Sequence, residues 1–353
     1  MNGSLVFKDY KNLFKKKEII SKNFSYNNIQ PSSIDLTLSC ECYELKYSFL
    51  SPKGKIRSKL KDISKKKYDL ATGLIFKKNH TYLVRLNEKL NLKSRIQGKC
   101  NPKSSTGRLD IFCRTILDKS DEYEKIPLKY KGEMFIEITC KSFNIKFHEG
   151  DSLNQMRLVF NNNIYLDDKQ LITENKKNKL CFSNRKSIFE NGLKLTVDLS
   201  DDNRICAYRS KKNSPIINFS ENKCHKYKNY WLPIKPKNKT LVIKKNRFYI
   251  LKSKERICIP PNLAGEMIPY DTGIGDFRVH YAGFFDPGFG YSKGAFAVLE
   301  VKTNEVDFII EDGQTIARIK YEKLNKSPSM LYGKNINSNY QNQKLALSKH
   351  FKE

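Results

Sequence analysis

The string KSSTGR, residues 103–108, brings together groups that can bind phosphate. Ser104 and Ser105 offer adjacent hydroxyls, and Lys103 and Arg108 supply a positive charge on each side of them. Hydroxyls, backbone N–H groups and a guanidinium are frequent partners of phosphate oxygens. An ordinary polar turn has the same composition, and on this string alone it is the simpler interpretation.

Two later strings carry carboxylates in distinctive places. Asp286 precedes Pro287 and Gly288 in FDPGFG, a strong turn signal that predicts a hairpin tip. Glu300 lies in the apolar run AFAVLEVK, where alternation points it inward if Val298 faces the same way. A buried carboxylate has a raised pKa and can serve as a general base near neutral pH. A plain turn and a solvent-facing glutamate are the alternatives.

The elements that must position these residues occur twice along the chain. Similar strings recur after 163 to 167 residues: KKNHTYLV from Lys77 and KKNRFYIL from Lys244, with Gly98 matching Gly265, Asp35 matching Asp198, and Glu137 matching Glu300. A period of this length indicates duplicated domains rather than a short-repeat solenoid. We call them copy one, residues 1–166, and copy two, residues 181–325.

The two copies keep different parts of the site. Copy one has KSSTGR where copy two has the unrelated YDTGIG. Copy two has HYAGFFDPGFG, residues 280–290, where copy one has LDKSDE. Neither copy is complete alone. We therefore predict one composite site, formed within a chain or between chains, with Glu300 rather than Glu137 as its carboxylate.

Short β-branched or aromatic runs dominate both copies. Examples are IDLTLSCECYEL and MFIEITC in copy one, and RFYILK and IARIKY in copy two. They predict a mainly β fold of two tandem distorted β-barrels, or jelly rolls, with few short helices. One amphipathic helix is predicted over residues 8–20. The polar residues 167–180 are expected to link the copies, and residues 326–353 to form a tail, either a disordered end or a lid.

Composition limits the class of protein. The 353 residues include no apolar run near the roughly 18 residues of a membrane span and none suited to a signal peptide, so we expect a cytoplasmic protein. The net charge of +29 invites a nucleic-acid interpretation, but the lysines are scattered among many Asn and Ile residues. We therefore favour an anionic small ligand over nucleic acid. The nine cysteines form no Cys-x-x-Cys, which favours buried thiols over a zinc site.

Together these strings resemble the long, tandem form of dCTP deaminase, a family of the dUTPase-like superfamily. The family pattern is SIDL, RSSxAR, a hairpin T-A-x-x-x-D-P-G-[WF]-x-G, V-L-E, and a tail with a tyrosine and N-Q. The matching segments are residues 33–36, 103–108, 281–290 and 298–300, with Tyr332 and Gln343 in the tail. Lys103, Gly107, Tyr281 and Asn339 depart from the pattern.

The resemblance implies hydrolytic removal of the 4-amino group of dCTP, which gives dUTP and ammonia. It implies no zinc, in agreement with the missing H-x-E…P-C-x-x-C signature of zinc deaminases. Glu300 would take a proton from the attacking water and deliver protons to the ring nitrogen and the leaving amine. Arg108 and Ser104 would assist at the reacting centre.

The resemblance also implies the substrate contacts. Main-chain groups of residues 279–282 would read the cytosine edge, and the tail would close over the triphosphate. The substrate-binding residues expected on this basis are Lys103, Ser104, Ser105, Arg108, His280, Tyr281, Ala282, Asp286, Val298, Leu299, Tyr332, Asn339 and Gln343. Mg²⁺ would arrive with the nucleotide, held by phosphate oxygens and water. A homotrimer is the expected assembly.

Two other functions compete with deamination alone. A bifunctional enzyme would carry dCTP through to dUMP, although Asp286 departs from the usual aspartate hairpin of a dUTPase. A non-catalytic nucleotide sensor or nucleic-acid-binding barrel would not need Glu300 or the intact KSSTGR string.

Overall fold

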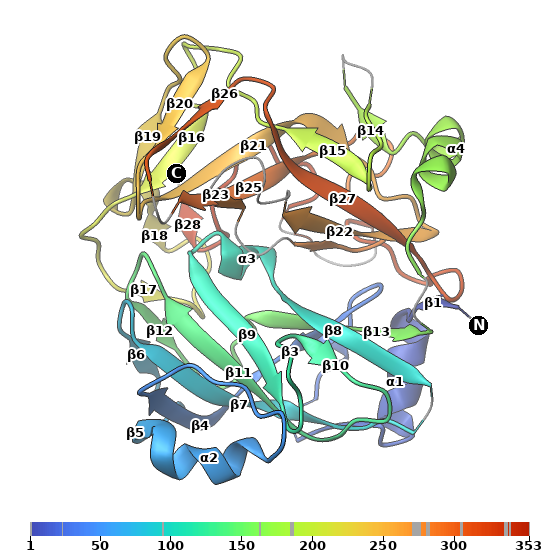
Figure 1. Ribbon diagram of the computed structural model, residues 1–353, viewed down its shortest axis with the longest axis vertical. Helices are drawn as coiled ribbons and strands as arrows, with labels where there is room; N and C mark the ends of the chain where they lie inside the picture. Colours follow the sequence, from blue (N-terminus) through green and yellow to red (C-terminus); the bar gives the residue numbers. More distant parts are fainter. Residues whose placement is uncertain are drawn as a thin grey trace.

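The computed structural model confirms a mainly β fold in two halves (Figure 1). Copy one forms the blue-to-green half and copy two most of the yellow-to-red half. The structure describes residues 2–22, 24–93, 95–161, 164–183, 187–269, 277–279, 283–303, 306–334, 338 and 340–352, with only the backbone at 269 and 277–279. No helix among these residues is long and apolar enough to cross a membrane.

Copy one contains two large antiparallel sheets. Its strands are β1 (Gly3–Ser4), β2 (Ile19–Ser21), β3 (Ile34–Leu36), β4 (Leu38–Leu45), β5 (Ser64–Asp69), β6 (Leu74–Phe76), β7 (Thr81–Asn91), β8 (Ile96–Pro102), β9 (Ile111–Leu117), β10 (Lys125–Ile126), β11 (Lys131–Cys140), β12 (Ile145–Phe147) and β13 (Asn154–Phe160). Its helices are α1 (Phe7–Lys15), α2 (Ile56–Ile63) and α3 (Ser104–Gly107), with a 3-10 turn η1 (Tyr26–Asn28). The sheet orders are β1-β13-β8-β10, with β3 on β13, and β5-β4-β7-β11-β9, with β2 on β7.

Copy two repeats this plan. Its strands are β14 (Cys181–Phe182), β15 (Leu193–Thr196), β16 (Ala207–Ser210), β17 (Ile217–Asn218), β18 (His225–Lys226), β19 (Trp231–Ile234), β20 (Thr240–Ile243), β21 (Phe248–Ile257), β22 (Leu263–Pro269), β23 (Phe277–Val279), β24 (Phe284–Phe285), β25 (Ala295–Thr303), β26 (Phe308–Glu311) and β27 (Thr315–Lys323), with a 3-10 turn η2 (Tyr227–Asn229). The sheet orders are β19-β16-β21-β25-β23, with β14 on β21, and β15-β27-β22-β24. The tail ends in β28 (Phe351–Lys352).

Strand register shows that the two copies are structural repeats. Glu137 of β11 stands opposite Leu83 of β7, and Glu300 of β25 stands opposite Ile250 of β21. These are the residue pairs that the sequence alignment of the copies matches. The duplication in the sequence is therefore a duplication of the sheet.

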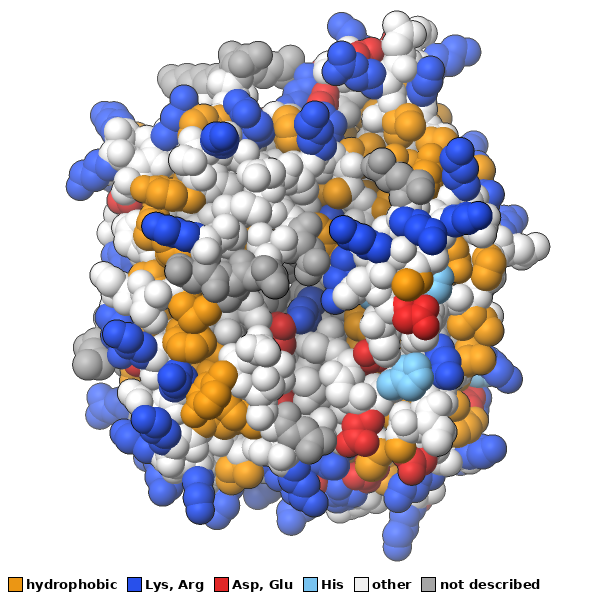
Figure 2. All heavy atoms as spheres, turned by 180° about the vertical axis from the view of Figure 1, so that it is seen from behind, with side chains coloured by type: hydrophobic (Ala, Val, Ile, Leu, Met, Phe, Trp, Pro, Cys, Tyr) orange, Lys and Arg blue, Asp and Glu red, His pale blue; other side chains and the backbone are white. Residues whose placement is uncertain are grey.

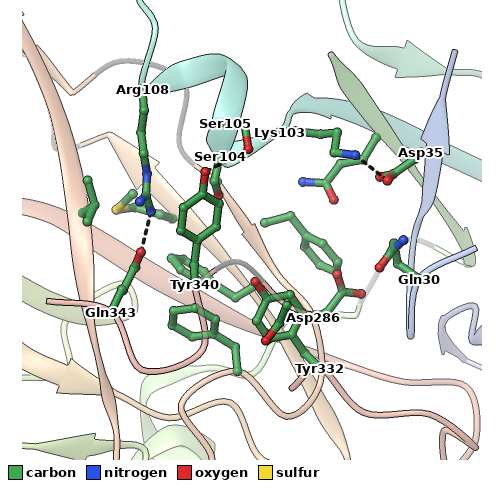
Figure 3. A pocket seen from close by; sticks show the side chains of 18 of the residues that line it. Gln30, Asp35, Lys103, Ser104, Ser105, Arg108, Asp286, Tyr332, Tyr340 and Gln343 are labelled. Atoms are coloured by element: carbon green, nitrogen blue, oxygen red, sulfur yellow. Dashed lines mark hydrogen bonds and ion pairs between the residues drawn. The ribbon is translucent and has the colours of Figure 1, made fainter. Parts of the chain in front are cut away.

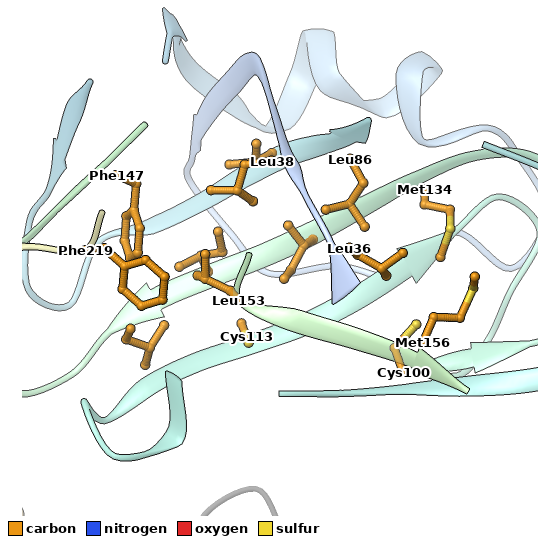
Figure 4. Close-up of a cluster of buried hydrophobic side chains, with 14 of the residues drawn as sticks. Leu36, Leu38, Leu86, Cys100, Cys113, Met134, Phe147, Leu153, Met156 and Phe219 are labelled. Atoms are coloured by element: carbon orange, nitrogen blue, oxygen red, sulfur yellow. The ribbon is translucent and has the colours of Figure 1, made fainter. Parts of the chain in front are cut away.

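The core of copy one fills the space between its two sheets (Figure 4). Leu36 and Leu38 from β3 and β4, and Met134 and Met156 from β11 and β13, are fully buried there. Strand alternation places these apolar side chains inward, and burying each such side chain stabilises the fold by about 1.5–3 kcal/mol. Copy two has its own core of the same kind.

The connection between β16 and β19 ties copy two to copy one. Its strand β17 pairs in parallel with β12 of copy one, and Phe219 packs into the core of copy one with the buried Trp231 that follows. Val298 of β25 joins the same core. In Figure 1, the α3 turn lies where the two halves meet.

The first helix, the linker and the tail can be compared with the elements expected from the sequence. The first helix ends at Lys15 rather than at residue 20, because Lys17 takes a left-handed φ of 54° and Ile19 then pairs with Leu90 as part of β2. The expected polar linker contains the helix α4 (Asp168–Asn178), which Asp167 caps by accepting the N–H of Gln170. The tail packs against both copies.

Candidate active site

One cavity of about 200 Å³ is lined by both copies and by the tail (Figure 3). Copy one contributes Gln30, Asp35, Lys103, Ser104, Ser105, Arg108 and Gln155; copy two contributes Met267, Gly283, Phe284, Phe285, Asp286, Phe289, Val298 and Glu300; the tail contributes Tyr332, Ser338, Tyr340 and Gln343. The KSSTGR string and Glu300 therefore meet within a single chain.

The KSSTGR string folds as the single turn α3 directly after β8. The N–H of Lys103 and the hydroxyl of Thr106 both donate to the carbonyl oxygen of Leu153, at 2.9 and 2.8 Å, which fixes the turn against β13. The Lys103 ammonium forms an ion pair with Asp35, the aspartate of SIDL (Figure 3). The turn thus presents two hydroxyls, an ammonium and a guanidinium to one cavity.

Arg108 links this turn to the tail. Its Nη2 donates to Oε1 of Gln343 at 2.6 Å, and its Nη1 donates to the carbonyl oxygen of Ala346 at 3.2 Å. The ring of Tyr340 lies against the guanidinium, with its centroid 3.9 Å away. Since a planar guanidinium both stacks and donates in its own plane, one side chain can contact three tail residues.

Glu300 reaches from copy two toward the same turn. Its carboxylate lies so close to Gly107 that a Cβ at that position would collide with it, although the carboxylate is at the mobile end of its side chain. Burial raises the pKa of Glu300 well above its usual range, the charge of Asp110 raises it further, and the Arg108 guanidinium opposes the shift. A buried carboxylate beside a guanidinium is suited to general acid–base catalysis.

Strand alternation on β25 selects the side chains that reach the cavity. Val298 and Glu300 line it, as a two-residue period requires. Leu299 points to the other face and packs in the core of copy two, so its side chain does not belong to the lining.

Asp286 places a second buried carboxylate at the cavity. It lies at the start of the expected turn, with Gly288 at a φ of 98°, and its Oδ1 accepts the N–H of Ser32 from copy one at 2.9 Å. Burial raises the pKa of Asp286 to about 7. Hairpin and first copy are thus joined at the cavity wall.

The described residues of the tail contact α3. The Tyr340 hydroxyl is 2.9 Å from the hydroxyl of Ser105, and Ser348 donates to the Ser105 carbonyl oxygen at 2.9 Å. Beyond these contacts, β28 pairs in parallel with β18, and the fully buried His350 lies 2.9 Å from the carbonyl oxygen of Phe219. The tail therefore contacts the α3 turn, strand β18 and Phe219.

Some expected residues lie outside the described part of the chain, and some lining residues were missed. His280, Tyr281, Ala282 and Asn339 lie outside the described residues. Gln30, Gln155, Ser338 and Tyr340 line the cavity without having been singled out. Tyr340 stands next to the N-Q signal of the tail and could have been found there; nothing in the strings around Gln30 or Gln155 marks them.

The equivalent place in copy one is closed. Glu137 is 1% exposed and forms an ion pair of 2.6 Å with Arg114, which contacts the segment 46–63. Ser48 of that segment accepts a hydrogen bond from Arg114, and its α2 side chains pack in a small core beside the strand of Glu137. The segment 46–63 thus packs beside the strand of Glu137, as the α3 turn of copy one lies against Glu300.

Family models for both halves of dCTP deaminase match the chain. The model described as 2'-deoxycytidine 5'-triphosphate deaminase (DCD) N-terminal domain covers residues 1–162, and the C-terminal domain model covers residues 167–351, slightly more than half of the chain. The chain belongs to the dCTP deaminase family. Membership makes it an enzyme of nucleotide metabolism, a hydrolase.

A solved structure agrees with the deaminase fold. The crystal structure of 2'-deoxycytidine 5'-triphosphate deaminase from Agrobacterium tumefaciens has a TM-score of 0.88 and 34% sequence identity, over 93% of this chain and 99% of that chain. The two-domain fold expected from the family resemblance is thereby confirmed. Among curated protein sequences, none matches this chain.

Proposed function

We propose that this deaminase hydrolyses dCTP to dUTP and ammonia in the composite pocket, without zinc and with Glu300 as general base. One observation carries the proposal: a buried carboxylate from copy two lies against the KSSTGR turn of copy one in a cavity that both copies line. Neither copy alone has both parts. Burial and a guanidinium partner are the usual means of holding a carboxylate ready for proton transfer.

The residues divide the chemistry between them. Ionised Glu300 takes a proton from a water that attacks C4 of the cytosine and passes it to the ring nitrogen. It then takes the proton of the new C4 hydroxyl and passes it to the amino group, which leaves as ammonia while the C4 carbonyl forms. Arg108 stabilises the negative charge of the ionised carboxylate. Desolvation raises the pKa of Glu300, and a raised pKa favours uptake of a proton by the carboxylate.

The other end of the substrate meets the basic side of the pocket. Ser104, Ser105 and Lys103 bind phosphate oxygens, and Tyr332 and Gln343 close over them. Lys103 must then share its charge between Asp35 and the phosphate. Mg²⁺ enters as part of the nucleotide substrate.

Asp286 supports a second candidate, a bifunctional enzyme that also hydrolyses dUTP to dUMP. It lines the same cavity, and a carboxylate whose pKa is about 7 can act as a second base. Incubation with dCTP and Mg²⁺, scoring ammonia, dUTP, dUMP and pyrophosphate, separates the candidates. Ammonia with dUTP alone means deamination only; dUMP with pyrophosphate means the bifunctional reaction; no ammonia contradicts both.

A cytoplasmic homotrimer of two-domain chains, with copies at 1–166 and 181–325 joined by 167–180, completes the proposal. Figure 2 bears on partners: lysine and arginine side chains are spread over that face rather than gathered in one stripe, in keeping with a small anionic substrate. Sedimentation at several concentrations tests the trimer.

A further inference from the structure

An ion pair crosses the boundary between the copies beside the pocket. Asp110 follows Arg108 by two residues in copy one, and Lys302 follows Glu300 by two residues on β25. Lys302 Nζ lies 3.1 Å from Oδ2 of Asp110, which is fully buried. Because alternate residues of a strand share a face, Glu300 and Lys302 reach toward copy one side by side.

The Asp110 side of the pair is held firmly. Its φ is 54°, a left-handed conformation that Asp adopts more readily than most residues. Its N–H donates to the Gly107 carbonyl oxygen at 2.9 Å, and its own carbonyl oxygen accepts the N–H of Lys141 at 3.0 Å. The Ser142 hydroxyl donates to Oδ2 at 2.7 Å. The exit of the α3 turn is thereby tied to the end of β11 and to β25.

The pair is specific to the boundary that contains the pocket. The repeat that matches Glu137 with Glu300 places Thr139 of copy one where copy two has Lys302. Register agrees, since Thr139 stands opposite Thr81 and Lys302 opposite Phe248. The closed site of copy one therefore has no lysine at this position.

We propose that Asp110 and Lys302 are positioning residues for deamination: their ion pair holds the Glu300 strand against the α3 turn and sets the charge that the Glu300 carboxylate meets. The proposal rests on the proposed role of Glu300 as base. A buried ion pair contributes little net stability, and its best-attested use is to fix one arrangement of packed elements.

The charges around Glu300 give the proposal a signature. From α3 and the segment after it, Arg108 and Asp110 face the carboxylate, and the Cys113 thiol faces it from β9. Asp110 raises the pKa of Glu300 and Arg108 lowers it. Lys302 extends from the same strand face, and we expect its positive charge to favour the ionised carboxylate.

Asp110 itself meets charge from two elements. Lys302 of β25 and Lys141, which follows β11, both favour its ionised form, while burial raises its pKa. Removing the Asp110 charge should therefore lower the pKa of Glu300, and we expect removal of the Lys302 charge to raise it. A packing role alone would not give opposite signs.

The test compares the variants Asp110→Asn and Lys302→Met over a range of pH. Asn keeps the shape and tolerates the left-handed φ, and Met keeps the length of the lysine stem. The acidic limb of kcat/KM for dCTP should move to lower pH in Asp110→Asn and to higher pH in Lys302→Met, each by about half a unit or more. In both, kcat should fall about tenfold while KM changes little.

The double variant Asp110→Asn/Lys302→Met leaves no unpaired buried charge. Its acidic limb should return toward that of the natural chain while its kcat stays low. The proposal is overturned if the acidic limbs of the two single variants shift in the same direction or do not shift. A normal kcat in the double variant also overturns it, and this result can be obtained even if a single variant fails to fold. Glu300→Gln, measured in parallel, tests the role of Glu300 separately from that of the ion pair. Full activity of this variant would show that Glu300 is not the base.

Discussion

Glu300 is a buried carboxylate, and its proposed role as general base depends on both properties. The Glu300→Gln variant keeps the shape of the side chain but cannot take a proton from water. We expect kcat for ammonia release to fall by about 10²- to 10⁴-fold, the usual worth of general acid–base catalysis, with dCTP affinity within a few-fold. Glu137→Gln is the matched control, because it changes the equivalent residue of the closed copy. Equal loss of activity in both variants would contradict a single composite site.

Asp286 should make stability depend on pH. Its pKa is raised from 3.8 to about 7, so the folded chain binds this proton more tightly than the unfolded chain. The stability it contributes is fully present below about pH 4 and is lost as the pH rises to about 7, by up to about 1.4 kcal/mol per pH unit. Glu124, whose pKa is also raised to about 7, acts in the same direction.

The Asp286→Asn variant should therefore lose less stability than the natural chain between about pH 5 and about pH 7. Asn can still accept the N–H of Ser32, so the hairpin contact is kept. Urea unfolding at both values measures the difference. Glu41 and Glu266, whose pKa values are lowered to about 2, act with the opposite sign and only at lower pH. Parallel slopes in the two proteins would show that Asp286 does not titrate there.

Among the elements, the tail has two of its hydrogen bonds near α3 at one hydroxyl, that of Tyr340. Tyr340 shares hydrogen bonds with Ser105 and with the N–H of Lys349, at 2.9 and 3.1 Å. Tyr340→Phe removes both and keeps the ring against Arg108. We expect KM for dCTP to rise about 30-fold, from roughly 1 kcal/mol for each of the two lost hydrogen bonds, with a smaller change in kcat. Tyr291→Phe, at an exposed tyrosine, is the control and should change neither.

At the scale of the whole molecule, opposite charges distinguish the two copies where they meet. Lys99 and Glu266 occupy equivalent positions of β8 and β22, yet they form an ion pair of 2.5 Å. Arg157 of copy one, fully buried, pairs with Glu266 at 3.0 Å and with the buried Glu322 at 2.5 Å. Identical copies would place like charges at the equivalent positions. The cluster therefore favours copy one against copy two over either copy against itself.

Breaking this cluster from one side should be costly. Arg157→Met leaves Glu322 buried without its guanidinium, and we expect a loss of about 3–5 kcal/mol in the free energy of unfolding. Denaturant unfolding measures it. Arg204→Met, which removes an exposed ion pair with Asp201, is the control and should have little effect. Equal small losses would mean that the boundary does not depend on these charges.

The closed site of copy one predicts the stoichiometry of binding. Arg114 bonds both Glu137 and Ser48 of the segment 46–63. The N–H of Ile56 in this segment donates to Asp118 at 2.8 Å, as the N–H of Ser32 donates to Asp286. We expect calorimetry of the Glu300→Gln variant with dCTP and Mg²⁺ to give one nucleotide per chain. Two nucleotides per chain would show that the segment opens and that copy one has a site of its own.

Part of the site can be predicted from short sequence strings, whereas other lining residues come together only through contacts between distant parts of the chain. Lys103, Ser104, Ser105 and Arg108 were predicted from one string because a turn keeps neighbours together. Gln30 and Gln155 line the same cavity, but their closeness arises from sheet packing and leaves no local pattern. Leu299 was included because it adjoins Glu300, and strand alternation turns it away.

Local strings and their spacing are enough to predict the duplication, the mainly β class and the family, and they point to Glu300 as the glutamate of the site. The folded chain shows in addition that KSSTGR and Glu300 line one pocket, that Glu137 pairs with Arg114 beside residues 46–63, and that the end of the tail pairs with β18. These features depend on contacts between residues far apart in the sequence. Such contacts follow from how the two cores pack, and neither period nor composition records that packing.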